Sequence, residues 1–377
     1  MEKRTLKTLV KSDEDLLHWI QLTRSENVGP QTFHHLLKRY KTPYKALEAL
    51  PELASQGGLK RPLKIAAFSA VEKELLHTRA LGAEFLTFDD PFYPPLLRHI
   101  ESAPPVLTVK GKIELLQRPL FAIVGARNAS AIGRKMALQF ARDLGKRGWG
   151  ITSGLARGID AAAHEGSLSF GTIAVLAGGM DQIYPPENEA LYHRISEEGV
   201  LLAESPFGTP PQATLFPRRN RIISGISRAI LVVEAALKSG SLITTRYALE
   251  QGREVFAIPG HPLDPRARGC NQLIKTGAVL VETLEDIEQE ISPSTPLTLQ
   301  EGSLFIEDTH PSSSLKKARH LINENLSYVP ISIDELVRQC HLSASEVWIA
   351  LLEMEIAGRL ERLPGGKVSL KEEWKSL

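Results

Sequence analysis

Residues 121–130 read Phe-Ala-Ile-Val-Gly-Ala-Arg-Asn-Ala-Ser, and a helix-forming stretch follows them directly. The first four residues are apolar without alternation, which is typical of a strand that is buried on both faces. The glycine and the polar residues after it form a turn into the N-terminus of a helix. A strand, a turn and a helix N-terminus in this order predict an α/β sheet with an anion site at the turn.

Six more apolar runs alternate with helix-length stretches on the C-terminal side of this strand. They are residues 150–152, 173–176, 200–203, 230–233, 255–258 and 279–281. Near-continuous apolarity in each run predicts a mostly parallel sheet with helices on both faces, over residues 82–292. Ligands of such sheets bind beyond the carboxyl ends of the strands, so the turns after the strands are the candidate site.

Helical segments flank this predicted sheet. Residues 1–80 are helix-patterned, and Val28-Gly29-Pro30 separates two of the helices. This hairpin is either an ordinary helical-bundle turn, the preferred interpretation, or a helix-hairpin-helix module whose amides contact DNA phosphate. After a predicted linker at residues 293–314, residues 315–377 predict two helices and a hairpin with the outline of a winged helix. Glu346, Glu353 and Glu355 on the second helix favour a structural or protein-contacting role over reading a DNA groove.

Composition excludes several classes of protein. The 377 residues carry a formal net charge of +1, so a uniformly basic surface is excluded and an anion site must be local. Cys270 and Cys340 lack metal-ligand spacing and are expected to be structural thiols, with no metal and no cofactor. No signal peptide and no membrane-spanning run is recognised, which predicts a cytoplasmic protein without membrane contact.

One stretch departs from this neutral background. Residues 215–225 read Leu-Phe-Pro-Arg-Arg-Asn-Arg-Ile-Ile-Ser-Gly, and no carboxylate occurs between Glu204 and Glu234. On a helix, Arg218 and Arg221 share a face and Arg219 lies about 100° round from it, so the arginines predict a continuous track for a phosphate backbone. Phe216 either stacks on an unpaired base or belongs to the core, and both interpretations stay open.

The turn at residues 125–130 carries Arg127 where a dinucleotide-binding fingerprint needs its second glycine. NAD binding is therefore disfavoured, and the absence of a Walker A motif also disfavours a P-loop ATPase. Arg127 is expected to bind phosphate, and Ser130 to cap the following helix or donate its hydroxyl to the ligand.

Three other strand ends carry turns of small residues. They contain Ser153, Gly154 and Arg157; Gly178 and Gly179; and Ser239, Gly240 and Ser241. Asp160 and His164 lie four residues apart and form either an acid–base pair or, as preferred, a brace for the loop. Amide-rich turns without a catalytic constellation favour a binding surface over a reaction centre.

Six motifs in this order resemble the DNA-processing protein A (DprA, or Smf) family. They are residues 121–127, 153–160, 184–188, 216–225, 239–245 and 252–260. The resemblance implies a Rossmann-like central domain, an N-terminal helical domain like a sterile-alpha-motif domain and a C-terminal winged-helix-like domain. It also implies a non-catalytic protein that binds and protects single-stranded DNA, loads RecA onto it in natural transformation and forms a homodimer through the Rossmann-like domain.

The residues and the resemblance together define the candidate DNA-contacting set. Its members are Gly125, Ala126, Arg127, Ser130, Ser153, Gly154, Arg157, Gly178, Gly179, Phe216, Arg218, Arg219, Asn220, Arg221, Ser239, Gly240 and Ser241. Ala126 and Gly178 replace a serine and a threonine of the family motifs, so two hydroxyl donors are missing.

Two other functions compete with DNA binding. The first is a nucleotide or sugar-phosphate hydrolase like the lysine-decarboxylase-like phosphoribohydrolases, because Ser239 to Glu250 faintly resembles their glycine-rich loop. Glu250 comes too late in that loop to match their catalytic glutamate. The second is a transcription regulator, which the acidic second helix of the winged-helix segment disfavours.

Overall fold

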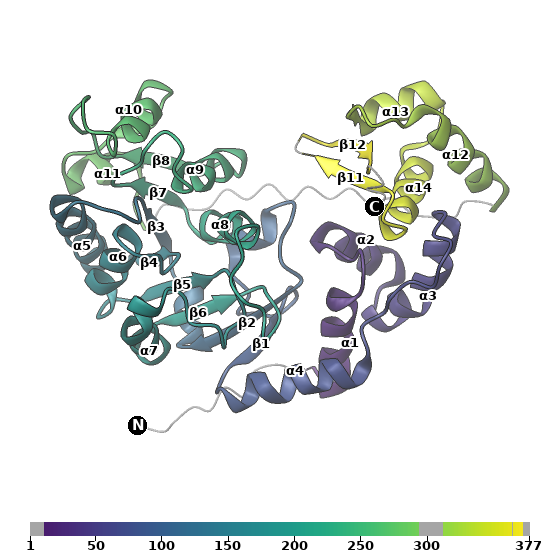
Figure 1. The fold of residues 1–377 in the computed structure, drawn as a ribbon, viewed down its shortest axis with the longest axis horizontal. Helices are drawn as coiled ribbons and strands as arrows, with labels where there is room; N and C mark the ends of the chain where they lie inside the picture. Colours follow the sequence, from purple (N-terminus) through teal and green to yellow (C-terminus); the bar gives the residue numbers. More distant parts are fainter. Residues whose placement is uncertain (1–10, 294–311, 364, 372–377) are drawn as a thin grey trace, which may run out of the picture. The chain divides into compact units, whose positions relative to one another are not determined.

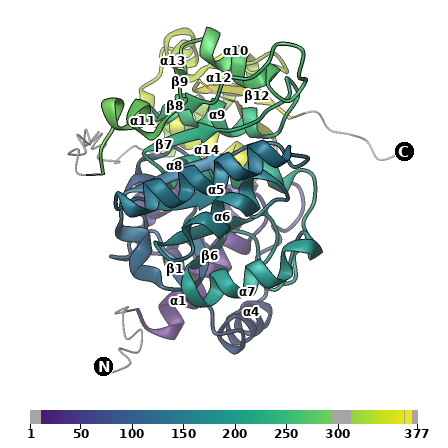
Figure 2. The same cartoon turned by 90° about the vertical axis from the view of Figure 1, so that its left-hand side faces the viewer.

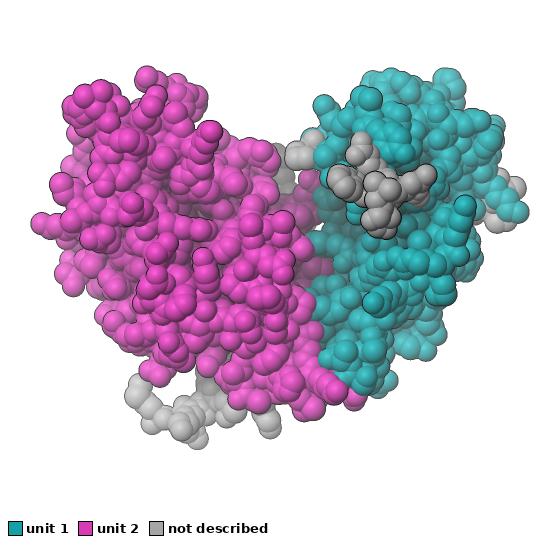
Figure 3. Space-filling model, viewed as in Figure 1, with its two compact units in different colours: residues 1–71, 299–377 teal, residues 72–298 magenta. Residues whose placement is uncertain are grey.

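The computed structural model describes residues 11–293, 312–363 and 365–371. The chain divides into two compact units, which Figure 3 shows in separate colours: residues 1–71 with 299–377, and residues 72–298. Most of the predicted linker, residues 294–311, lies outside the described residues. The predicted domain boundaries therefore stay predictions.

The larger unit is built on a nine-stranded sheet in the order β1-β2-β6-β5-β4-β3-β7-β8-β9 (Figure 1). The strands are β1 (Glu84–Thr87), β2 (Val106–Gly111), β3 (Leu120–Val124), β4 (Gly150–Ser153), β5 (Thr172–Leu176), β6 (Val200–Ala203), β7 (Ala229–Val232), β8 (Glu254–Ala257) and β9 (Val279–Leu280). From β6 to β9 all neighbours are parallel, which confirms the mostly parallel sheet and its seven predicted strands. Strands β1 and β2, at one end of the sheet, pair antiparallel and had not been predicted.

Helices cover both faces of this sheet, as predicted. One face carries α5 (Ala131–Lys146), α6 (Ile159–Ser167), α7 (Glu189–Glu198) and α11 (Leu284–Glu290), and Figure 2 looks onto α5, α6 and α7. The other face carries α8 (Leu215–Ile226), α9 (Ser241–Glu250) and α10 (Arg268–Lys275), with the 3-10 helices η1 (Pro95–His99) and η2 (Ile113–Gln117).

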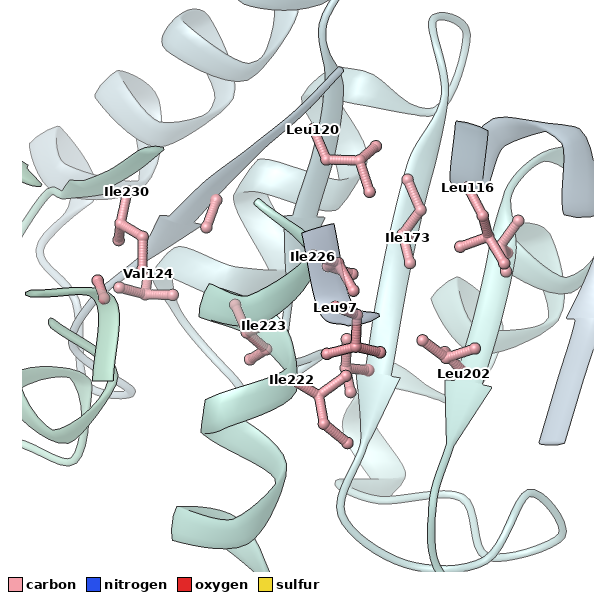
Figure 4. Packing of buried hydrophobic residues seen from close by; sticks show 14 of the residues in the cluster. Leu97, Leu116, Leu120, Val124, Ile173, Leu202, Ile222, Ile223, Ile226 and Ile230 are labelled. Carbon is pink, nitrogen blue, oxygen red and sulfur yellow. The ribbon is translucent and has the colours of Figure 1, made fainter. Parts of the chain in front are cut away.

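The alternation of β3 explains the two layers. Phe121 and Ile123 enter the core under α5 and α6, whereas Val124 enters the core under α8. In that second core Ile222 and Ile226 of α8 are buried against the sheet (Figure 4). Each such side chain contributes about 1.5–3 kcal/mol of transfer free energy, which holds α8 against the sheet.

The smaller unit combines both ends of the chain. Its N-terminal part contains α1 (Asp13–Arg24), α2 (Pro30–Tyr40) and α3 (Pro43–Gln56), after which α4 (Phe68–Ala80) leads into the larger unit. Its C-terminal part contains α12 (Ser312–Asn325), α13 (Ile333–Cys340), α14 (Ala344–Ile356) and the strands β10 (Ile331–Ser332), β11 (Leu360–Leu363) and β12 (Lys367–Leu370). The helix pair α13–α14 followed by the β11–β12 hairpin is the predicted winged helix. The first turn of α12 falls within the range predicted as linker.

Helix caps set the start of the two predicted winged-helix helices. The side chain of Ser332 accepts a hydrogen bond from the backbone of Glu335 at the start of α13. Ser343 and Glu346 form a reciprocal capping box at the start of α14. Within the described residues, no helix combines the length and apolarity needed to cross a membrane, and no cluster of side chains is suited to a metal.

Candidate nucleic-acid interface

The site lies where the order of the strands reverses. From β3 the chain builds β4, β5 and β6 on one side and then β7, β8 and β9 on the other. The carboxyl ends of β3, β4, β5 and β7 therefore meet at one edge, and the turn between β3 and β7 is a topological switch point. The structure thus brings the four predicted turns to one edge of the sheet.

A carboxylate of the protein occupies the helix N-terminus at this switch point. Ser130 is the N-cap of α5, and its hydroxyl accepts a hydrogen bond from the amide of Gly133 at 2.9 Å. The amide and hydroxyl of Ser130 donate to the two carboxylate oxygens of Glu234, at 2.9 and 2.6 Å. The capping role of Ser130 is confirmed, but a phosphate at this position would have to displace Glu234.

An exposed cluster of one guanidinium and two aromatic rings stands at the same edge. Arg127 is exposed, and its guanidinium lies 4.8 Å from the ring centroid of half-buried Phe216. The ring of Tyr184, which is 44% exposed, lies 5.7 Å from the ring of Phe216. We call Arg127, Tyr184 and Phe216 the stacking cluster. Phe216 is therefore not fully buried in the core. Its ring lies beside an arginine and a tyrosine, which are residue types that stack on nucleic-acid bases.

A small hollow adjoins the stacking cluster. Gly154, Gly178, Tyr184, Pro211 and Phe216 line it, and its volume is about 20 Å³. A volume of this size holds about one water molecule. A base would therefore stack on the outer surface of the cluster rather than enter a pocket.

Arg219 is a buried structural arginine. It is 5% exposed, and one guanidinium nitrogen donates to the carbonyl oxygens of Gly154 and Val175, both at 2.5 Å. Burial lowers the pKa of Arg219 to about 10, and the nearby charge of Arg127 acts in the same direction. A side chain at Gly154 would meet the guanidinium at 2.0 Å, which accounts for glycine there.

Arg221 is also turned inward. Its guanidinium lies 2.5 Å from a carboxylate oxygen of Glu204, and the two side chains are 8% and 15% exposed. Arg218 is exposed. The prediction of a continuous guanidinium track along α8 is therefore wrong, because two of its three arginines bind the protein itself.

Asn220 ties α8 to the turn before α9. Its side-chain amide donates to the carbonyl oxygen of Gly240 at 3.3 Å. In that turn the hydroxyls of Ser239 and Ser241 lie 2.7 Å apart. These groups order the turn, and only Gly240 of its three small residues is exposed.

Asp160 and His164 brace the loop after β4, which confirms the preferred interpretation of this pair. The Asp160 carboxylate accepts from the amides of Gly154 and Ala156, at 3.1 and 3.4 Å. Nε2 of His164 accepts from the amide of Leu155 at 3.3 Å. Burial raises the pKa of Asp160 and lowers that of His164 to about 3, so the imidazole is neutral near pH 7.

The remaining candidates divide by burial. Ser153 is buried and donates to the carbonyl oxygen of Ile123 at 2.7 Å, so its hydroxyl is committed to the sheet. Gly178 and Gly179 are buried, and the amide of Gly179 donates to the carbonyl oxygen of Thr209. Arg157 is exposed and lies 3.4 Å from a carboxylate oxygen of Glu187. Gly125 and Ala126 are half-buried in the turn that carries Arg127.

Three residues of the site were not assigned by sequence reasoning. Tyr184 stood in a motif used for the family resemblance but was given no role, and its contact with Phe216 spans distant parts of the chain. Glu204 and Glu234 were noted only as the ends of the acid-free run. Each of them bonds within that edge, to Arg221 and Ser130 respectively.

Glu250, which comes too late in the sequence to match the catalytic glutamate of the hydrolase alternative, also lies away from the turn. Glu250 is the last residue of α9, and its carboxylate lies 3.2 Å from the guanidinium of Arg246 on the exposed side of that helix. Ten residues of helix span about 15 Å, so Glu250 lies far from the Ser239–Ser241 turn.

Family models match all three parts of the chain. Residues 84–292 match DNA recombination-mediator protein A, residues 13–76 match the DprA-like N-terminal HHH domain, and residues 307–366 match the DprA winged helix domain. These matches confirm the resemblance found in the motifs and the helical and winged-helix flanks.

Similar proteins agree with the family models. Protein Smf of Escherichia coli is 39% identical over 311 residues, which cover 80% of this chain and 81% of the relative. The structure of DNA processing protein A from Streptococcus pneumoniae superposes with a TM-score of 0.64 at 34% identity, over 75% of this chain and 99% of that one. The structure of DNA processing protein A from Helicobacter pylori, described for its single-stranded DNA binding mode, has a TM-score of 0.50 at 28% identity, over 54% of this chain and 94% of that one. The chain therefore belongs to the DNA recombination-mediator protein A family of DNA-processing proteins.

Proposed function

We propose that the protein binds single-stranded DNA across the carboxyl edge of its sheet, with the stacking cluster and Arg218 as the main contacts. The observation that carries the proposal is the exposed guanidinium of Arg127 over Phe216, beside the ring of Tyr184. Aromatic faces stack on unpaired bases, and arginines bind the phosphates between them. The relative from Helicobacter pylori, described as a single-stranded DNA binder, supports the same ligand.

The proposed contacts are fewer than the predicted set. Within the described residues neither Arg127 nor Arg218 forms an ion pair, so both are available for phosphate. Arg219 and Arg221 support the site from inside by holding the loop after β4 and the end of β6. We assign them a positioning role rather than a phosphate contact.

We further propose that the bound strand is passed to RecA and that the protein acts as a homodimer through the Rossmann-like domain. Family membership as a recombination mediator supports the transfer to RecA, and the family resemblance supports the dimer. Filament formation by RecA on strands already coated with single-strand binding protein tests it. Addition of the protein is expected to shorten the lag of filament growth, and an unchanged lag would refute RecA loading.

The single-strand proposal predicts that Arg127→Ala weakens binding to a fluorescent oligothymidylate in an anisotropy titration. One lost phosphate contact lowers the slope of log affinity against log salt by about 0.7, so the loss is largest at low salt. Loss of the stacked partner of Phe216 adds to this effect.

The matched control is Arg142→Ala, which removes the same charge from an exposed position on α5. Arg142 lies about 16 Å along the helix axis from its start, away from the carboxyl edge. Equal affinities of the two variants would refute the assigned site, and equal affinity of the unchanged protein for duplex and single strand would refute the assigned ligand.

A further inference from the structure

The second helix of the winged helix buries apolar residues on more than one face. Val347 and Leu351 of α14 pack in the core of the winged helix itself. Ile349, Leu352 and Ile356 are also buried, although they are not part of that core cluster. Apolar residues buried outside the core of the winged helix need another cover, so a second body must lie against this face of α14.

The N-terminal helices supply that second body. Gly57, the C-cap of α3, lies so close to α14 that a Cβ atom there would be 1.9 Å from the backbone oxygen of Glu353. The guanidinium of Arg359 donates to the carbonyl oxygen of Gly57 at 3.2 Å. Backbone therefore meets backbone between α3 and α14, which only a residue without a side chain allows.

Two further contacts extend this interface. The ring of His35 on α2 lies 4.9 Å from the ring of Trp348 on α14. The side-chain amide of Asn27, in the turn before α2, donates to the carbonyl oxygen of Ile356 at the end of α14, at 2.9 Å. Asn27, which directly precedes the Val28-Gly29-Pro30 hairpin, thus satisfies a carbonyl group of α14.

A buried charge pair between α12 and α14 also belongs to this interface. Glu353 is 1% exposed on its side chain and forms two hydrogen bonds with Arg319 of α12, at 2.6 and 2.8 Å. Arg319 also donates to the side chain of Gln56 at the end of α3, at 2.9 Å. One arginine therefore joins α12, α14 and α3. Glu353, one of the three glutamates that disfavour a DNA-reading role for this helix, has a structural partner in Arg319.

We infer that α14 is the docking surface for the N-terminal helical domain, and that the two ends of the chain form one closed body. Winged helices that read DNA place the corresponding helix in the major groove. Here the N-terminal helices occupy its outward face, so neither α14 nor the turn that contains Asn27 contacts DNA in this state. This inference concerns the terminal unit and does not depend on the proposed single-strand site.

Gly57→Ala in the full chain tests the docking. The φ angle of Gly57 is −71°, so alanine introduces no backbone strain, and its Cβ meets only the α14 interface. Gly29→Ala is the control, because a Cβ there has nothing within 4 Å. The measurement is hydrogen–deuterium exchange of residues 344–356, with α13 as an internal reference for the fold of the winged helix.

Gly57→Ala is expected to speed exchange in α14 at least roughly tenfold, the effect of about 1.4 kcal/mol on local opening, while Gly29→Ala and α13 keep their protection. Asn27→Gly is the second variant: the φ of Asn27 is 59°, which glycine accepts, and only the bond to Ile356 is lost. It is expected to speed exchange at the C-terminal end of α14 alone. Unchanged protection of α14 in both variants would overturn the inference.

Discussion

Arginines that are neighbours in sequence have different roles at the edge of this sheet. Arg218 is exposed, Arg219 donates to two loop carbonyls, and Arg221 binds Glu204. A guanidinium offers five donors in a rigid fork, which suits it equally to phosphate and to protein carbonyl and carboxylate groups. Burial of its surroundings, and not its residue type, decides which of these it binds.

At the residue scale we predict that Arg221→Ala lowers the stability of the protein. Removal of the guanidinium leaves Glu204 largely buried without its partner, which costs about 3 kcal/mol. The free energy of unfolding in urea measures the loss. Without urea, where the variant is folded, the affinity of Arg221→Ala for an oligothymidylate should fall less than the affinity of Arg127→Ala.

The double variant Arg221→Ala with Glu204→Ala provides the control. It should recover part of the lost free energy, because no carboxylate is then left without a partner. A stable Arg221→Ala variant with sharply weakened DNA binding would instead restore Arg221 to the phosphate contacts.

At the scale of the elements, the N-terminus of α5 is a predicted anion site that a carboxylate of the protein itself occupies. Its N-terminus has the capping serine and the amides that attract an anion, and Glu234 from the end of β7 is that anion. The carboxylate is stabilised by the helix dipole and at the same time fastens β7 to the turn after β3. It also places a negative charge in the turn region that carries Arg127.

At the scale of this element we predict that Glu234→Gln raises the affinity for single-stranded DNA at low salt. Removal of a carboxylate beside the proposed phosphate path lowers the repulsion between the protein and the DNA phosphates. The gain in affinity should disappear at high salt, because the Debye length then shortens to a few ångströms. The same change should lower the free energy of unfolding by about 1 kcal/mol, since charged hydrogen bonds to the N-cap are lost.

Anisotropy titrations between low and high salt measure the first effect and urea unfolding the second. Glu254→Gln removes the same charge from the exposed first residue of β8, at the opposite edge of the sheet, and should leave the affinity unchanged. An affinity that does not rise in Glu234→Gln would show that the strand passes elsewhere.

For the whole molecule, the two compact units have separate cores. Leu202 belongs to a core of the sheet, whereas Leu336 and Leu351 belong to the core of the winged helix. Each core lies entirely within its own unit. Parts of a protein unfold cooperatively when they share a packed core. Because the two units have separate cores, we expect them to unfold separately.

At this scale we predict two transitions in urea denaturation. Leu202→Ala should shift only the transition of the larger unit, by about 3 kcal/mol, because a fully buried leucine is lost from its core. Pulse-labelled hydrogen exchange, read separately for β5 and for α13, assigns each transition to its unit. A single transition that moves as a whole would show that the units are energetically coupled.

Local patterns predicted much of this fold because strands and helices depend on neighbouring residues. Uninterrupted apolar runs located all seven parallel strands, and the turn after β3 was placed with its cap at Ser130. The antiparallel strands β1 and β2 were not predicted, because the pairing of β1 with β2 and of β2 with β6 joins segments that are distant in the sequence. Of the site, the exposed Arg127 and the loop brace at Asp160 were foreseen, and Tyr184 was not.

The sequence alone determined the order of the elements, the parallel sheet, the edge on which the turns meet and the family. Those properties follow from periodicity and short motifs, which are readable within a few residues. The tertiary structure alone decided which charges face solvent: it paired Arg221 with Glu204, placed Glu234 on the α5 N-terminus and stacked Arg127 on Phe216. The physical reason is that burial and ion pairing join residues distant in the chain, and only the packed molecule shows which partner each charge meets.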